Sequence, residues 1–150
     1  MKIAFAADHR GLALKNYLAA AARELGHEPV DFGTYDDLSC DYVDFGLKAA
    51  QAVVKDEADR GVLVCATGIG MSIAANKIPG VRAALCWTIY MARLTRLHNN
   101  ANVLVLSGDQ TAFHYGREIL KVWLETPFEG GRHERRVAKI KEIEDYYSKK

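Results

Sequence analysis

The feature that most constrains the fold is a fivefold alternation of two patterns. Short apolar or β-branched runs lie at residues 2–6, 27–32, 61–65, 81–86 and 102–106. Segments with helical spacing of apolar residues follow at 12–25, at 45–54, in a short stretch ending near 77, at 88–97 and at 112–125. This alternation predicts right-handed crossovers and one open parallel sheet. The expected fold is α/β, a three-layer Rossmann-like fold with five parallel strands.

The end of the chain departs from this alternation. Pro127, Gly130 and Gly131 interrupt the pattern before a last helix, expected at about 134–147. Its apolar residues are sparse for a helix that packs on its own sheet, so it either lies loosely or reaches a second subunit. No repeat or long linker divides the chain, and we expect one domain over residues 1–150.

Charge and cysteine use exclude several classes of protein. Lys and Arg number 20 against 19 Asp and Glu, so no global field would hold a nucleic acid or an anionic membrane. No run resembles a membrane span or a signal peptide, which favours a cytoplasmic protein. Cys40, Cys65 and Cys86 are odd in number and lack metal-site spacing, so we expect reduced thiols.

Ligands of open parallel sheets bind where the strands end. The strongest signal there is the segment from Cys65 to Ser72, in which Gly68 and Gly70 let backbone N–H groups approach an anion. A helix beginning at this point would favour the thiolate form of Cys65, as a base or nucleophile. The alternative is that Cys65, like Cys86, is a small core residue.

The same segment excludes several known motifs. A dinucleotide fingerprint fails because Ile73 stands where a small residue is needed, and no Gly-Lys-Ser/Thr phosphate loop occurs. Met71 stands where a cysteine phosphatase has arginine, and Cys65 where a receiver module has aspartate.

Other candidates carry both a functional and a structural interpretation. His9 and Asp8 follow the first strand, although Asp8 could be only a turn residue. His98 precedes the fifth strand and is nearly as well explained by capping or packing. Arg132 and Arg136 lie four apart and could converge on one phosphate, or be solvated. His27, His114 and His133 have no acid or cysteine at metal-ligand spacing, so no metal site is expected.

Together these motifs resemble the type B ribose-5-phosphate isomerase family, which includes allose-6-phosphate and galactose-6-phosphate isomerases. The resemblance extends from the first strand to about Ile143. The matching motifs are Ala7–Asp8–His9, Asp41–Tyr42, the run from Cys65 to Lys77, Leu97–His98–Asn99, Asn102–Val103–Leu104, and Glu129 to His133 with Arg136.

The resemblance implies an aldose–ketose isomerase that works through a cis-enediolate without a metal or cofactor. By position, Cys65 is the base, Thr67 and His98 open the sugar ring, and the backbone N–H groups of Gly68, Ile69, Gly70, Met71 and Ser72 stabilise the oxyanion. Asp8, Tyr42 and Asn99 would hold hydroxyl groups, and His9, Arg132 and Arg136 the phosphate. In this family the active site lies between two subunits, which implies a homodimer or a dimer of dimers.

One residue departs from the family pattern and leaves the substrate open. Family members commonly place an arginine just after the fifth strand, where this chain has Asp109. The substrate could be ribose 5-phosphate, allose 6-phosphate, galactose 6-phosphate or a free sugar. Two other classes stay open: a non-catalytic module that binds a sugar phosphate or nucleotide, and a structural subunit paired with a related chain.

Overall fold

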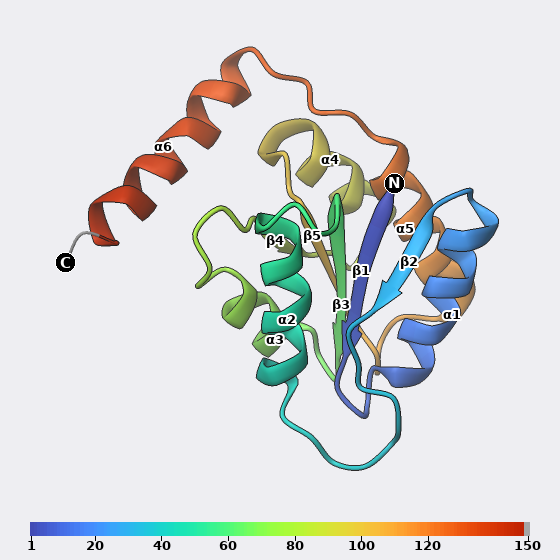
Figure 1. The fold of residues 1–150 in the computed structure, drawn as a ribbon. Helices are drawn as coiled ribbons and strands as arrows, with labels where there is room; N and C mark the ends of the chain where they lie inside the picture. Colours follow the sequence, from blue (N-terminus) through green and yellow to red (C-terminus); the bar gives the residue numbers. More distant parts are fainter. Residues whose placement is uncertain (149–150) are drawn as a thin grey trace.

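Five parallel strands form one sheet in the order β2-β1-β3-β5-β4 (Figure 1). The computed structural model describes residues 1–148. The strands are β1 (Lys2–Ala7), β2 (Glu28–Asp31), β3 (Arg60–Cys65), β4 (Ala83–Leu85) and β5 (Val103–Ser107). The chain goes from β1 to β2 on one side and later to β3 on the other side of β1. The strand order therefore reverses between β1 and β3, where sheets of this kind bind ligands beyond the carboxyl ends.

Helices cover both faces of the sheet, because the strand residues point alternately to each side. Helices α1 (Leu12–Glu24), α4 (Ile89–Asn99) and α5 (Phe113–Glu125) cover one face, and α2 (Tyr42–Val54) and α3 (Ile69–Ala75) the other. Fully buried side chains fill both layers, among them Phe5 and Trp123 on the first face and Leu63 and Met71 on the second. The expectation of a three-layer α/β fold is confirmed.

Element boundaries differ from the prediction by a few residues. Helix α2 begins at Tyr42, three residues earlier than expected, because Asp41 is the extended residue that precedes it. The fourth strand is the shortest, and only its residues Ala83–Leu85 pair with β5. The last helix begins at Arg132, directly after Gly131, whose φ of +56° is a left-handed conformation that glycine adopts readily.

Helix α6 (Arg132–Tyr147) extends from the body of the molecule (Figure 1). Its main contact is with α4, and the carboxylate of Glu144 accepts a hydrogen bond from the N–H of Gly80 at 3.0 Å. Within the described part of α6, His133 is the one buried residue. No helix among residues 1–148 has the length and apolar character required to cross a membrane.

Candidate active site at the carboxyl edge

The turn after β1 is organised by the carboxylate of Asp8. Its Oδ1 accepts hydrogen bonds from the backbone N–H groups of Arg10 at 3.0 Å and Gly11 at 2.9 Å. The chain must pass very close to β3 here, since a Cβ on Gly11 would lie 2.4 Å from the carbonyl oxygen of Val64. Asp8 is therefore a buried turn residue, 5% exposed, that also lies beside the end of β3.

Cys65 ends β3, and the turn after it leads directly into α3. The side chain of Cys65 is buried on the face that α2 and α3 cover. Thr67 is exposed, and its Oγ1 accepts a hydrogen bond from the N–H of Ile69 at 3.3 Å. Gly68 has φ +80°, and a Cβ there would lie 2.4 Å from Leu85, so only glycine fits this turn.

The first turn of α3 offers fewer free N–H groups than the five expected. The N–H of Ile69 is used by Thr67, and that of Ser72 donates to the carbonyl of Gly68 at 3.0 Å. Among the described residues, no acceptor within the protein is found for the N–H groups of Gly68, Gly70 and Met71. These three remain the candidates for binding an oxyanion.

Tyr42 borders the same turn, and His9 follows the neighbouring strand β1. The ring of Tyr42 covers Gly70, since a Cβ on Gly70 would lie 2.5 Å from its Cζ. The Nδ1 of His9 accepts a hydrogen bond from the backbone N–H of Cys40 at 3.3 Å. A neutral histidine that accepts at Nδ1 carries its proton on Nε2, so His9 presents a donor suited to a phosphate oxygen.

A second group of predicted residues lies elsewhere, around the end of α4. The rings of His98 and His133 are stacked, with centroids 4.1 Å apart and planes 7° apart. The Nε of Arg132 donates to Nε2 of His133 at 3.3 Å. Glu129 has a carboxylate oxygen 3.8 Å from Nε2 of His98 and 3.9 Å from Nε2 of His133. Arg136 is exposed one helical turn after Arg132, and Asn99 lines a cavity beside α6.

The second group also contains the side-chain types of a metal site, but one of its donor atoms already has a partner. His98, Glu129 and His133 have donor atoms within 4.8 Å of one another, a set whose types could hold a metal ion. However, Arg132 already donates to the Nε2 that a metal would take. Burial, followed by the charges of His98, Arg132 and Arg136, lowers the pKa of His133, although Glu129 acts in the opposite direction.

The two groups occupy opposite edges of the sheet. Cys65 pairs with Ser107 at the carboxyl edge, whereas Gly61 pairs with Val103 at the amino edge, where its N–H donates to the carbonyl of Asn102 at 2.9 Å. The four residue steps of β3 from Gly61 to Cys65 separate these two positions by about 13 Å. Helix α4 leaves the carboxyl edge after β4 and ends at the amino edge, carrying His98 and Asn99 with it. One chain therefore does not bring His98 to Cys65.

The residue that departs from the family pattern, Asp109, is neutralised within the chain. Its carboxylate pairs side-on with the guanidinium of Arg10, with Nε–Oδ1 at 3.2 Å and Nη2–Oδ2 at 2.7 Å. Sequence reasoning did not find this pair, nor the contacts of His133 and Glu129 with His98. The signal that could have drawn attention to Arg10 and His133 was adjacency in the sequence, because each directly follows a candidate phosphate-binding residue, His9 or Arg132.

The fold and the reactive side chains at the strand ends define an α/β enzyme of the open parallel-sheet class. The profile of the Ribose/Galactose Isomerase family matches residues 3–140, and the chain belongs to this family. Membership confirms the resemblance found in the sequence and the expectation of an aldose–ketose isomerase that acts on a sugar phosphate.

Individual relatives agree in sequence and in structure. The chain is 43% identical to ribose-5-phosphate isomerase B of Escherichia coli K12, over 95% of this chain and 96% of that protein. The structure of ribose-5-phosphate isomerase B from Clostridium thermocellum superposes with a TM-score of 0.96 at 50% identity, covering 98% of this chain and 99% of that one. The structure of ribose-5-phosphate isomerase B from Mycoplasma genitalium with bound ribulose 5-phosphate superposes with a TM-score of 0.92 at 41% identity, covering 96% of each chain.

Proposed function

We propose that this isomerase interconverts ribose 5-phosphate and ribulose 5-phosphate, with Cys65 as the base. The observation that carries this proposal is the position of Cys65, at the end of a central strand beside three unpaired N–H groups. The Cys65 thiolate would remove the proton from C2 of the open-chain aldose, and the resulting thiol would return a proton to C1, while the proton of the C2 hydroxyl passes to O1. The N–H groups of Gly68, Gly70 and Met71 would stabilise the enediolate oxygen between these steps.

The remaining groups at the carboxyl edge have roles that suit their surroundings. Asp8 keeps Oδ2 available for a sugar hydroxyl, while Oδ1 holds the turn. Tyr42 covers the first turn of α3 and can hydrogen bond another hydroxyl. The Oγ of Thr67 is exposed and can take part in ring opening, and His9 can donate to the phosphate.

We propose that the second group acts in the site of a partner subunit. His98, Asn99, Arg132 and Arg136 lie at the amino edge, a strand length from Cys65 of the same chain. Only a second copy could place His98 at the sugar ring and the two arginines at the phosphate. A symmetric homodimer would complete two such sites, because each chain both gives and receives the same group.

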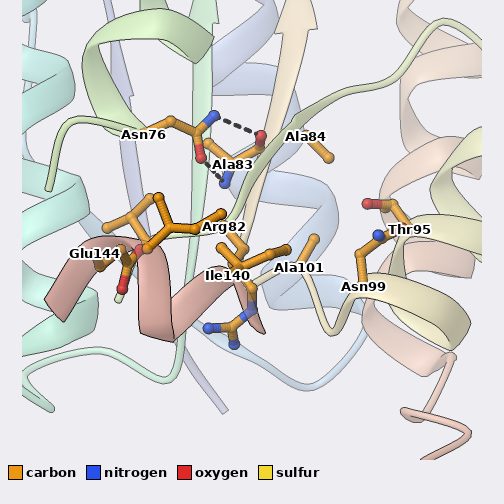
Figure 2. A pocket seen from close by; sticks show the side chains of 11 residues that line it. Asn76, Arg82, Ala83, Ala84, Thr95, Asn99, Ala101, Ile140 and Glu144 are labelled. Atoms are coloured by element: carbon orange, nitrogen blue, oxygen red, sulfur yellow. Dashed lines mark hydrogen bonds between the residues drawn. The ribbon is translucent and has the colours of Figure 1, made fainter. Parts of the chain in front are cut away.

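The surroundings of α6 support this homodimer. A cavity of about 440 Å³ lies between α6, α4 and β4, lined by residues that include Asn99, Ile140 and Glu144 (Figure 2). Ile143 is 59% exposed and Tyr147 67% exposed on the same helix. We propose that a partner chain covers these apolar groups, and that residues 1–150 form one domain whose last helix completes its packing only in the dimer.

A cytoplasmic location fits the same chemistry. All three cysteines are free thiols in the structure, and the proposed base must be reduced to act. Reducing compartments keep such thiols free.

Proton NMR of the purified protein with three phosphorylated aldoses tests the substrate. We expect ribulose 5-phosphate to form from ribose 5-phosphate faster than ketoses form from allose 6-phosphate or galactose 6-phosphate. A faster reaction with either hexose phosphate would reassign the substrate within the family. The corresponding free sugars serve as controls for the need for phosphate.

Mixing two inactive variants tests the shared site. Cys65→Ala and His98→Asn homodimers are each expected to be inactive. Random exchange of subunits makes half of the dimers mixed, and each mixed dimer has one intact site, so roughly a quarter of the original activity should return. If each site came from one chain, mixing would restore nothing.

A further inference from the structure

The loops at the carboxyl edge contain a single permanently charged cation. They comprise residues 8–11, 32–41, 66–68, 86–88 and 108–112, and Arg10 is the only Lys or Arg among them. The same loops hold five aspartates, namely Asp8, Asp36, Asp37, Asp41 and Asp109. A phosphate dianion approaching this edge therefore meets an acidic rim, and Arg10 is the one group of this chain that can offset it at every physiological pH.

Asp109 holds the guanidinium of Arg10 in one orientation. The pair uses Nε and Nη2, so the edge formed by Nη1 and the outer N–H of Nη2 stays available for a second acceptor. The Arg10 side chain is 57% exposed, so an oxygen from solution can reach this edge. A bidentate pair of this kind orients a guanidinium more firmly than a single contact does.

Backbone contacts keep this pair close to the proposed base. The N–H of Asp109 donates to the carbonyl of Ala66 at 3.1 Å, and the N–H of Gly108 donates to that of Cys65 at 2.8 Å. A Cβ on Gly108 would lie 2.7 Å from the carbonyl oxygen of Arg10, so the loops after β1 and β5 are packed against each other. Arg10 also directly follows His9, whose Nε2 can donate to a phosphate.

We propose that Arg10, oriented by Asp109, is a phosphate-binding residue supplied by the same chain as Cys65. This inference rests on the proposed isomerase function and adds to it a guanidinium that does not depend on a partner subunit. Arg10 would hold the phosphate from the side of His9, and Asp109 would act as a positioning residue that does not itself contact the substrate.

The test compares Arg10→Ala with the double variant Arg10→Ala/Asp109→Asn. In the single variant, the exposed acid of Asp109 could by itself repel a phosphate, and the double variant removes that charge. We expect both variants to raise KM for ribose 5-phosphate, and the inhibition constant of inorganic phosphate, by about tenfold, as for the loss of one charge-assisted hydrogen bond. We expect kcat to change much less.

Arg23→Ala is the matched control, because it removes an exposed arginine at the end of α1 on the amino edge. It should leave both constants unchanged. An unchanged KM in Arg10→Ala would overturn the inference. A double variant with the original KM would also overturn it, because the only role of Arg10 would then be to neutralise the charge of Asp109. If the unmodified protein isomerises no sugar phosphate, the proposed function itself fails. This result is distinguishable from the two outcomes above, in which the unmodified protein is active.

Discussion

Two buried cysteines show how surroundings separate a candidate base from a core residue. Cys86 is 1% exposed, and burial raises the pKa of its thiol to about 12, so it stays protonated near neutral pH. Cys65 is also buried, but it ends a strand beside the free N–H groups of Gly68, Gly70 and Met71. The structural interpretation therefore suits Cys86, whereas Cys65 has neighbours suited to an anionic reaction.

Replacement of Cys65 with alanine tests the base directly. Exchange of the substrate C2 proton with solvent deuterium, followed by NMR, should slow by roughly 1,000-fold, within the range for loss of a general base. Cys86→Ala is the matched control and should exchange at the original rate, while losing about 1 kcal/mol of stability from the smaller side chain. Undiminished exchange in Cys65→Ala would exclude this residue as the base.

The imidazole of His133 predicts a pH dependence of stability. Its pKa lies below the ordinary value of 6.5 in the folded protein. As the pH falls below about 6.5, the unfolded chain takes up this proton first, so the folded state loses stability toward acid and keeps it above that pH. Between pH 7.5 and pH 5.5, the free energy of unfolding measured in urea should fall less in His133→Phe than in the original protein. The phenylalanine retains an aromatic ring against His98. An equal fall in the free energy of unfolding in both proteins would contradict this prediction. The pKa of His27 is also lowered, but His27 is present in both proteins and therefore does not contribute to the difference between them.

At the scale of elements, a buried lysine joins α1 to β2. The Nζ of Lys15 lies 2.6 and 2.7 Å from the two carboxylate oxygens of Asp31 and donates to the carbonyl of Thr34 at 2.8 Å. Its side chain is 1% exposed, so it depends on these partners for its charge. The contact fixes the start of the loop after β2, which leads to Cys40 and the hydrogen bond with His9.

Lys15→Met is expected to lower the free energy of unfolding by about 2 kcal/mol, because the Thr34 carbonyl and the Asp31 carboxylate lose their partner. Urea denaturation measures this change. Lys55→Met, at an exposed position after α2, should stay within about 0.5 kcal/mol of the original protein. A similar small effect for Lys15→Met would mean that the buried pair contributes no net stability.

At the scale of the whole molecule, the candidate site is divided. The carboxyl edge carries the proposed base and the proposed oxyanion donors, and the amino edge carries His98, Asn99 and two arginines. Helix α6 packs mainly on α4 and leaves Ile140 exposed beside a cavity (Figure 2), which the exposed Ile143 also lines. Activity should therefore depend on association of two chains.

Ile143→Asp is expected to dissociate the proposed dimer, because it places a charge on the face that a partner would cover. Sedimentation should then report a monomer, with an unchanged circular dichroism spectrum and little activity. Tyr90→Asp is the control, since Tyr90 is 70% exposed at the other end of α4 and should keep the dimer. A fully active monomer would contradict the division of the site between chains.

Much of the fold follows from local patterns in the sequence. Apolar runs, helical stripes and the glycine or proline breaks between them located the five strands and six helices of residues 1–148, because each of these signals depends on neighbouring residues. The residues after β1 and β3, including Asp8 and Cys65, were expected at one edge, since parallel strands share a direction. The sequence could also have predicted that His98 lies far from Cys65 of the same chain, because a helix that follows one parallel strand must return to the opposite edge of the sheet before the next strand begins.

The sequence by itself determined the alternation, the parallel sheet and the identity of the residues that end β1 and β3. Only the tertiary structure decided the order β2-β1-β3-β5-β4, the stack of His98 on His133 and the pairing of Arg10 with Asp109. Arg10 and Asp109 are 99 positions apart, and no local pattern links them. Such contacts exist because packed loops bring distant segments together, whereas strands and helices follow from the spacing of nearby side chains.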